Sequence, residues 1–496
     1  MFCNLLSLPL LIFLPLLLAI FVATPLCPKN DIFIRRFVKG ATIFHLIYSF
    51  LFWGCYDKGF EAIWSPYWIK PLGIQFGFAM DEISLVMSIL TTIVFTLAVV
   101  ASKSQVRHGM RWYYALLLFL ETAILGIFNA ADIFLFFLFW ELELIPAYFL
   151  IANWGEGKAA KKSAIKFVLF TFIGSMFMLL GLLLLHYFNF LATNSLNGAF
   201  LAYDLSKVGV SLQIVVSILL LLGFCVKLPL VPIHTWLPDA HTDAPTPISM
   251  ILAGVLLKTG AYAIIRFNLQ ILPEAFAYIA PVLAVFALVN ILYTALIAYS
   301  QTDIKRIVAY SSISNMGLIL LGICSLNAIG LAGAIFHCVA HGLITVGLFM
   351  VCGIVAIRCK TRNINEIGGI AQSMPRLFGF ATIIVLASIG VPLFAGFVGE
   401  IVTIIGAMAS DLSDIMKFVA LFALPMLIIS SCYMLKFLHQ SFFGEIRECN
   451  PAFDITNHEF VVLAVVVILL LLFGCYPAAI FDTIGTAEML GGLLPW

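Results

Sequence analysis

Two glutamates, Glu141 and Glu143, lie in the middle of FFLFWELELIPAYFLIAN, a run at residues 136–153 whose other side chains are nearly all apolar. A charged side chain at the centre of a bilayer costs roughly 2.5–3.5 kcal/mol on insertion scales, so such groups pair, line a water-filled path or mark a functional site. Further ionisable residues lie in stretches of similar character, namely Glu121, Lys227, Lys258, His337, His341 and Glu400. Carboxylates, amines and imidazoles in this setting indicate a chain of proton carriers.

We expect Glu141 to be the partner of Lys227. A nearby opposite charge favours the charged form of both groups, whereas desolvation opposes it in both. If the pair separates, the lysine loses its counter-ion and releases a proton. Two residues along a helix turn by about 200°, so only one of the two glutamates can face a given partner. Glu143 is therefore expected to serve structure or a neighbouring subunit.

Lys258, in GVLLKTGAY, is expected to continue this line toward two histidines of HCVAHG. His337 and His341 are four residues apart and share one helix face, and imidazole titrates near neutral pH. Each of them taken alone is more often a hydrogen-bonded packing residue than a relay. A metal site is not indicated, because no glutamate follows the first histidine as in the HExxH protease pattern. Glu400 is expected to be the exit group.

The remaining polar residues of the apolar segments have other interpretations. Glu121 is either a supporting carboxylate or a contact with a neighbouring subunit. The segment PIHTWLPDAH contains His234, Asp239 and His241, which either gather protons at an entrance or form a satisfied polar turn. The histidines interpreted as structural are His45 and His186.

The elements that position these residues must be membrane-spanning helices. The chain of 496 residues is 63% hydrophobic and 10% charged, whereas soluble domains carry about 25% charged residues. About fourteen segments reach the roughly 20 apolar residues that a span needs. Their approximate centres are Ile12, Ser49, Thr91, Phe119, Leu142, Met176, Leu220, Leu256, Ala284, Gly317, Thr345, Leu386, Leu427 and Ile468.

Charge and cysteine content exclude several classes of function. The net charge of +1 provides no basic field for nucleic acid. The 11 cysteines show no CxxC pair and no cluster that would bind zinc or an iron–sulfur centre. No extramembrane stretch is long enough to hold a catalytic domain. The expected cofactor content of this chain is therefore none.

Lysine and arginine are distributed unevenly between the two sides of the expected membrane. About eighteen of them fall in alternate loops, beginning with the loop that follows the first span, and these loops should be cytoplasmic. The other loops hold only Lys58, Lys70, Lys207, Arg266 and Lys417. We expect both termini to lie on the outer side, and the N-terminal apolar segment, which has no basic residues before it, to be a retained span rather than a cleaved signal.

Two spans contain helix breakers in corresponding places. Span seven contains KLPLVPIHTW, with Pro229 and Pro232, and span twelve contains SIGVPLFAGFVGE, with Gly390 and Pro392. Broken helices five spans apart are typical of inverted-repeat transporters whose pathway lies at the breaks, although ordinary proline kinks would look alike. The expected divisions are 1–110 (helices 1–3), 111–270 (a first five-helix repeat), 271–440 (a second, inverted repeat) and 441–496 (a loop and helix 14).

The quoted motifs, together with KLPLVPIHTWLPDAHTDAPTPISMILAGVLLKTGAY and DIKRIVAYSSISNMG, resemble the antiporter-like subunits of proton-pumping NADH:quinone oxidoreductase, respiratory complex I. The resemblance covers roughly residues 70–440. Among the three large subunits L, M and N, the M type is most similar, because it carries glutamate at the second break, here Glu400, and because the chain lacks the long C-terminal lateral helix of subunit L.

The resemblance implies a role for each carrier. Glu141 and Lys227 would be the coupled pair, Lys258 the central relay, His341 a further relay and Glu400 the exit. Protons would move outward across a bacterial inner membrane while another arm of the complex oxidises NADH and reduces quinone. FMN, iron–sulfur clusters and quinone would be handled by other subunits, and the sister subunits L and N would be the main partners.

Two features depart from the family pattern. Asn315 stands in SSISNMG where some relatives carry histidine, so His337 or a bridging water would take that part. The break VPLFAGF also differs from the commoner LPGxxxF.

Two other functions are compatible with the same residues. One is a subunit of an Mrp-type sodium/proton antiporter or of a membrane-bound hydrogenase, which share the fold and most motifs. The other is a scaffold with an inert channel, which predicts that neutralising Lys227 leaves pumping intact.

Overall fold

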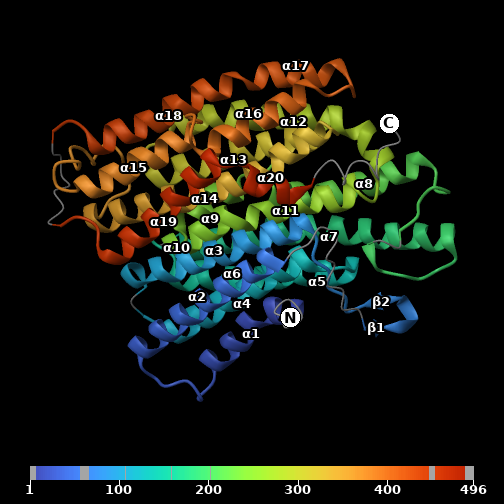
Figure 1. Cartoon of the computed structure of the whole chain (residues 1–496), viewed down its shortest axis with the longest axis horizontal. Coiled ribbons are helices and arrows are strands. Elements are labelled where there is room, and N and C mark those ends of the chain that lie inside the picture. The colour runs from blue at the N-terminus through green and yellow to red at the C-terminus, as the bar shows by residue number, and fades with distance from the viewer. Residues whose placement is uncertain are drawn as a thin grey trace.

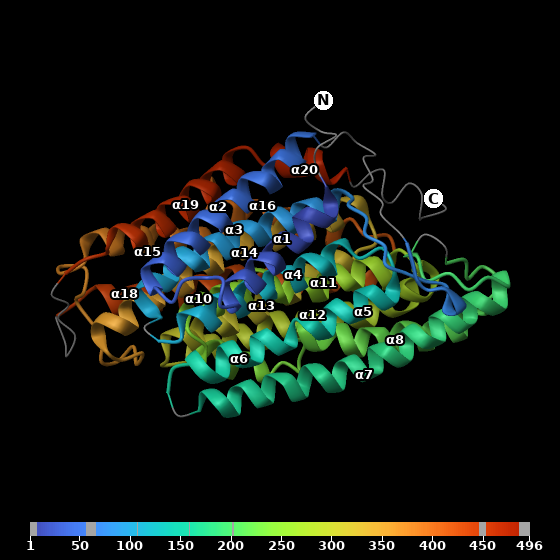
Figure 2. The same cartoon turned by 90° about the horizontal axis from the view of Figure 1, so that it is seen from below.

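The chain folds into a bundle of long helices whose axes run side by side across the molecule (Figures 1 and 2). The computed structural model describes residues 7–55, 66–106, 108–157, 159–200, 203–445 and 453–485. Twelve helices of this described part are long and apolar enough to cross a bilayer. The protein is therefore an all-α, multi-pass membrane protein, as expected.

The first part of the chain forms the helices at the bottom of Figure 1 and a small antiparallel hairpin. The elements are α1 (Leu8–Ala23), α2 (Asp31–Cys55), β1 (Tyr67–Ile69), the 3₁₀ turn η2 (Lys70–Leu72), β2 (Ile74–Gln75), α3 (Glu82–Gln105), α4 (Met110–Asn129), α5 (Ile133–Leu142), α6 (Leu144–Trp154) and α7 (Ala160–Thr193). Asp132 caps α5 by accepting hydrogen bonds from the backbone N–H groups of Phe134 and Leu135.

The middle of the chain contains one broken helix and one helix with two π-helical turns. The elements are α8 (Val210–Lys227), α9 (Trp236–Asp243), α10 (Thr246–Ile251), η4 (Leu252–Leu256), α11 (Leu257–Ala263) and η5 (Ile264–Leu269). The last four are consecutive parts of a single span, called span eight below, in which η4 and η5 are the π-helical turns.

The remainder of the chain forms helices in the middle and at the top of Figure 1, with α17 uppermost. They are α12 (Pro273–Ser300), α13 (Ile304–Cys324), α14 (Ala328–Cys359), α15 (Pro375–Ser388), α16 (Ala395–Met408), α17 (Asp414–Ala423), α18 (Pro425–Phe442), α19 (Asn457–Cys475) and α20 (Ala478–Ile484). Each of the expected span centres falls in one of the helices named here. The shorter apolar helices α1, α15 and α16 lie where spans one and twelve were expected.

The first predicted break separates α8 from α9. Pro229 and Pro232 have no N–H group to continue a helix. Freed backbone groups inside a membrane protein must find partners within the protein or in water. Here Val231 N–H donates to Asn290 Oδ1 (3.0 Å), and the indole N–H of Trp236 donates to the Val226 carbonyl (2.9 Å). The break is thus closed by side chains from neighbouring elements.

The second predicted break lies between α15 and α16. Gly390 adopts a φ of 72°, which favours glycine, and Leu393 a φ of 83°. The chain therefore turns sharply between the two half-helices, as Pro392 and the glycines of SIGVPLFAGFVGE predicted.

A third interruption, at Glu143 between α5 and α6, was not predicted. Pro146 explains it, because without an N–H group it cannot bond the carbonyl of Leu142 four residues earlier. The two short helices still form one continuous span.

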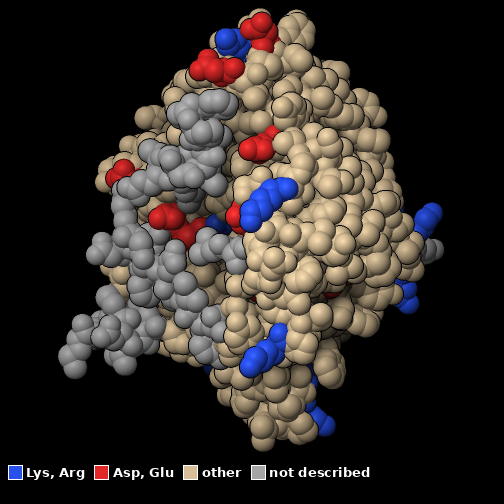
Figure 3. Space-filling view, turned by 90° about the vertical axis from the view of Figure 1, so that its right-hand side faces the viewer, with Lys and Arg blue, Asp and Glu red and all other residues tan. Residues whose placement is uncertain are grey.

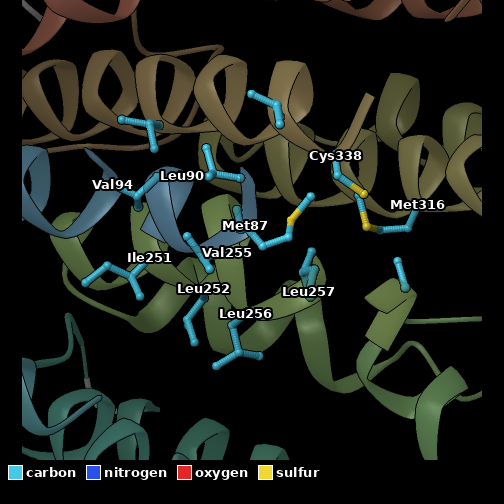
Figure 4. Close-up of a cluster of buried hydrophobic side chains, with 14 of the residues drawn as sticks. Met87, Leu90, Val94, Ile251, Leu252, Val255, Leu256, Leu257, Met316 and Cys338 are labelled. Carbon is cyan, nitrogen blue, oxygen red and sulfur yellow. The ribbon is translucent and has the colours of Figure 1, made fainter. Parts of the chain in front are cut away.

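Span eight, α3 and α14 form the centre of the bundle. The most apolar 18-residue windows of these spans are entirely buried, whereas those of α2 and α7 are only 33% and 39% buried and face the surroundings. Figure 4 shows how apolar side chains seal this centre: Met87, Leu90 and Val94 of α3 lie beside the labelled residues of span eight, and Met316 and Cys338 approach from α13 and α14. Ionisable groups in this centre are shielded from lipid.

Close helix contacts hold α16 against α14. A Cβ atom added at Gly333 would lie 2.5 Å from the backbone nitrogen of Thr403, and one added at Gly399 would lie 2.7 Å from Nδ1 of His337. Neither backbone can retreat without moving a helix that carries a candidate site residue.

We therefore expect Gly333→Ala to destabilise the protein by about 1–3 kcal/mol, the usual cost of overpacking a core. The measurement is the thermal unfolding midpoint of the purified, detergent-solubilised protein. Gly379→Ala is the matched control, because nothing lies within 4 Å of a Cβ at that position in α15. Equal midpoints for the two variants would contradict the close contact.

Charged side chains are sparse on the end of the bundle that carries β1 and β2 (Figure 3). The few that are seen include both signs, and some groups of opposite sign lie next to each other. This is the end at which the loops with few lysines and arginines were expected.

Candidate functional site

The buried ion pair of the first half joins Glu143 and Lys227. Lys227 is the last residue of α8, and its Nζ contacts Oε1 of Glu143, with the two side chains 1% and 0% exposed. The same Nζ lies 3.4 Å from the carbonyl oxygen of Trp140 and 3.4 Å from the centroid of its ring. A carboxylate, a carbonyl and an aromatic face together stabilise the ammonium in a dry setting.

The prediction that Glu141 is the partner of Lys227 is wrong. Phe136, Trp140, Glu143, Ala147 and Leu150 recur at helical spacing and are all buried, so they form the inward face of the fifth span.

Glu141 lies outside this inward face. It is only half-buried, beside Ser175 of α7, and the lipid-facing neighbours on this helix, Leu138 and Ile145, are 38% and 51% exposed. The sequence could not reveal this orientation, because apolar residues occupy every face of the helix.

Lys258 and His341 form the next pair. Nζ of Lys258 donates to Nδ1 of His341 (2.9 Å) and contacts the carbonyl oxygen of Ala253, which lies in the π-helical turn η4. Since Nδ1 accepts from the ammonium, the ring proton of neutral His341 is on Nε2. Nε2 has no hydrogen-bond partner among the described residues. It is therefore free to exchange a proton.

His337 contacts Asn315 directly. Its Nε2 donates to Oδ1 of Asn315 (3.0 Å), and the amide group of Asn315 donates to the Ser311 carbonyl (2.9 Å). The rings of His337 and His341 have centroids 6.2 Å apart. The structure thus places His337 beside Asn315, and its substitution for the missing histidine stays a prediction.

Glu400 lies beside the second break, and none of the described residues forms an ion pair with it. It is 2% exposed, and its Oε2 has no hydrogen-bond partner in the described part of the chain. A Cβ at Gly390 would lie 2.2 Å from this oxygen, so the glycine gives the carboxyl group room as well as giving the backbone its positive φ. Gly399, the residue before Glu400, packs on His337. The last imidazole and the carboxyl group therefore lie on adjoining elements.

Glu121 does not join this line. Its Oε1 lies 2.9 Å from Nδ1 of His45, and Nε2 of the same ring lies 2.9 Å from the Leu11 carbonyl oxygen. Both side chains of the pair are 1% exposed, so burial within the chain excludes the proposed contact with a neighbouring subunit. The pair connects α1, α2 and α4, which agrees with the structural role expected for His45.

Arg266 closes the C-terminal end of span eight. Its guanidinium pairs with Asp81 and donates to Ser84 Oγ (3.1 Å) and Gln270 Oε1 (3.1 Å). Burial by itself raises the pKa of Asp81, but the charge of Arg266 and hydrogen bonds from Arg266 and Ser84 outweigh it, and the pKa lies below its ordinary value. A permanent positive charge at this position opposes the passage of a proton.

The segment PIHTWLPDAH separates into two environments. Asp239 is partly exposed and forms ion pairs with Lys166 (2.7 Å) and Arg306 (2.5 Å), as a satisfied polar turn would. His241 is fully buried, and neither ring nitrogen has a hydrogen-bond partner among the residues described. In the described part of the chain, no group of three or more His, Cys, Asp or Glu residues could hold a metal ion.

Comparisons of sequence relate the chain to a known family. Residues 130–425 match the model described as NADH:quinone oxidoreductase/Mrp antiporter, transmembrane. NAD(P)H-quinone oxidoreductase chain 4 of Thermosynechococcus vestitus is 40% identical over 448 residues, which are 89% of this chain and 82% of that protein. NADH-quinone oxidoreductase subunit M of Pseudomonas aeruginosa is 36% identical over 466 residues, 91% of this chain and 90% of the relative.

Comparisons of structure give the same fold. A chain of respiratory complex I from Thermus thermophilus superposes with a TM-score of 0.87 at 26% identity, covering 98% of this chain and 100% of the other. A chain of the Mrp complex from a Dietzia species gives a TM-score of 0.86 at 20% identity, covering 98% and 97%. At 20% identity, the likeness to the Mrp chain shows a shared fold alone.

Proposed function

We propose that this chain is the proton-translocating chain 4 or M-type subunit of a complex I. It belongs to the transmembrane family of NADH:quinone oxidoreductase and Mrp antiporter subunits. The identity to chain 4 and subunit M over most of their lengths supports this choice within the family. The likeness to an Mrp complex, at 20% identity, favours no antiporter function. The observation that carries the proposal is a series of buried proton carriers, called the series below. Its members are Glu143, Lys227, Lys258, His341, His337 and Glu400.

The series consists of side chains that can donate or accept a proton. The closed Glu143–Lys227 pair keeps the ammonium charged. When the two separate, Lys227 loses the carboxylate that stabilises its charge and transfers a proton onward. Lys258 and His341 already share a hydrogen bond, and His337 and Glu400 continue toward the second break. Because Arg266 closes the outer end of span eight, protons leave through the second half, past Glu400.

The assembly and orientation follow from the same proposal. Sister antiporter-like subunits of the L and N types flank this chain in the membrane arm. FMN, iron–sulfur clusters and quinone are held by other subunits, and electrons do not pass through this chain. The relatives from Thermosynechococcus vestitus and Pseudomonas aeruginosa are both bacterial, which supports an inner membrane of a bacterium. The basic loops lie in the cytoplasm and both termini on the outer side.

The test of this function measures which ion moves. In membrane vesicles that contain the assembled complex, NADH-driven proton uptake is followed with a pH-sensitive dye, in buffers with and without sodium. Because every carrier in the series is a proton donor or acceptor, we expect equal uptake in both buffers and no NADH-driven movement of radioactive sodium. Uptake that stops without sodium would favour the antiporter function instead.

A further inference from the structure

The half of the molecule with the basic loops contains a pocket that the series from Glu143 to Glu400 does not use. The pocket has a volume of about 390 Å³, and the exposed residues Gly157 and Lys360 open it to the surface. Its wall also includes Gln105, from the end of α3, and Glu156, which follows α6. Polar and charged side chains therefore line part of this opening, which lies at the ends of α3 and α14.

Gln105 connects this pocket to a buried threonine of span eight. A Cβ atom at Gly353 of α14 would lie 2.3 Å from Oγ1 of Thr246 and 2.8 Å from Nε2 of Gln105, so both side chains converge on the same glycine. Neither the amide atoms of Gln105 nor the hydroxyl of Thr246 has a hydrogen-bond partner in the described structure.

The chain just before Thr246 carries further unpartnered atoms, at His241 and Thr242. Thr242 Oγ1 and both ring nitrogens of His241 are buried and have no hydrogen-bond partner among the described residues. One face of the imidazole stacks on Phe349, with ring centroids 5.3 Å apart and planes at 16°. The nitrogens at the ring edge therefore remain available, although a buried imidazole in a purely structural role normally makes hydrogen bonds.

Charged neighbours place His241 between the pocket and the central relay. The titratable groups whose charges reach its ring are Lys258, Lys305 and, across the same space, His341. Lys305 is fully buried and donates to Glu156 Oε2 (3.0 Å), a residue of the pocket wall. On the other side, Lys258 is bonded to His341. His241 is thus in electrostatic contact with both ends.

We propose that protons reach Lys258 from the side of the basic loops through His241, along a hydrated run that begins in the pocket and passes Gln105 and Thr246. Clusters of buried, unpartnered polar atoms are the places at which proteins bind internal water. The run enters the series at its centre and does not pass through Glu143 and Lys227. The transfer from Lys227 into the series is therefore a separate step from the delivery of protons to Lys258 through His241. This inference rests on the proposed function.

The test replaces the imidazole and then supplies it from solution. In vesicles with the basic loops facing the medium, we expect His241→Ala in the assembled complex to slow NADH-driven proton uptake by about a hundredfold, the scale of a lost proton carrier. Imidazole added to the medium should restore much of the rate, because the alanine leaves room for it. His241→Phe should be equally slow but not restored, because the phenyl ring fills the space on Phe349. Normal uptake in both variants, or an equal response of both to imidazole, would overturn the proposal.

Three further variants complete the design. Thr246→Val removes an unpartnered hydroxyl at constant volume, and we expect slower uptake. A normal rate in this variant overturns the proposal even if neither His241 variant assembles. His186→Ala is the matched control with normal uptake, since His186 is bonded to Tyr203 (3.0 Å) away from the series. Lys258→Met distinguishes failure of the proposed function from failure of the route through His241. Normal pumping in Lys258→Met contradicts the proposed function. Loss of pumping in Lys258→Met, together with normal pumping in the His241 and Thr246 variants, contradicts only the route through His241.

Discussion

Glu143→Gln is expected to reduce NADH-driven proton uptake to about a hundredth while the complex still assembles. Glutamine has the shape of glutamate but cannot serve as the counter-ion of Lys227. An uncompensated buried charge costs about 3–5 kcal/mol, so Lys227 rests neutral in this variant and has no proton to transfer. Quinone reduction coupled to pumping should slow with it. Dye-monitored proton uptake and NADH oxidation, measured on the same vesicles, check both effects.

Glu141→Gln is the matched control for this prediction. The two glutamates share one helix, but Glu141 is half-buried and is not in contact with Lys227. We therefore expect nearly normal uptake. The double variant Glu143→Gln, Lys227→Met should regain the stability that the single variant loses, because no lone charge remains, yet it should not pump. If Glu141→Gln were the inactive variant, the pair seen in the structure would not be the functional one.

Lys258→Met should abolish proton uptake to a similar degree. Methionine keeps much of the length of the lysine side chain. It removes the amino group that donates to Nδ1 of His341 and contacts the Ala253 carbonyl. The series is then divided at its centre, whichever route supplies the protons. The measurement is again uptake per NADH oxidised in the assembled complex.

Lys436→Met provides the comparison for this second prediction. Lys436 is also a lysine of an apolar helix, α18, but its Nζ donates to the Tyr299 carbonyl (2.6 Å) in a more exposed position. It lies outside the series, and its loss should leave uptake unchanged. Normal pumping by Lys258→Met would show that the central contact is structural.

The two breaks could be predicted from the sequence because the residues that cause them lie at the breaks themselves. Pro229 and Pro232 lack N–H groups, and Gly390 permits a positive φ, so backbone chemistry alone marks both places. The span centres were accessible for a similar reason, since a bilayer requires long apolar runs whatever they pack against. The identities of Lys227, Lys258 and Glu400 as buried charges followed directly.

The partners of these charged residues could not be predicted from the sequence, because they depend on contacts between different helices. Glu143 faces Lys227 because Trp140 and Ala147 face inward with it, and this stripe cannot be recognised on a helix that is apolar all round. The contact between His337 and Asn315 joins residues on different helices. The lack of hydrogen-bond partners for the ring of His241 likewise becomes visible only once the helices around it are placed.

The most direct test of the central claim is whether the carboxyl group of Glu143 changes protonation during turnover. Infrared difference spectra of the assembled complex, recorded as NADH is added, report the appearance of protonated carboxylic acids. We predict a carboxyl band that is present in the unchanged protein and in Glu141→Gln and absent in Glu143→Gln. A spectrum of Glu143→Gln that retains every carboxyl band would contradict the account, because Glu143 would then not take part in proton transfer.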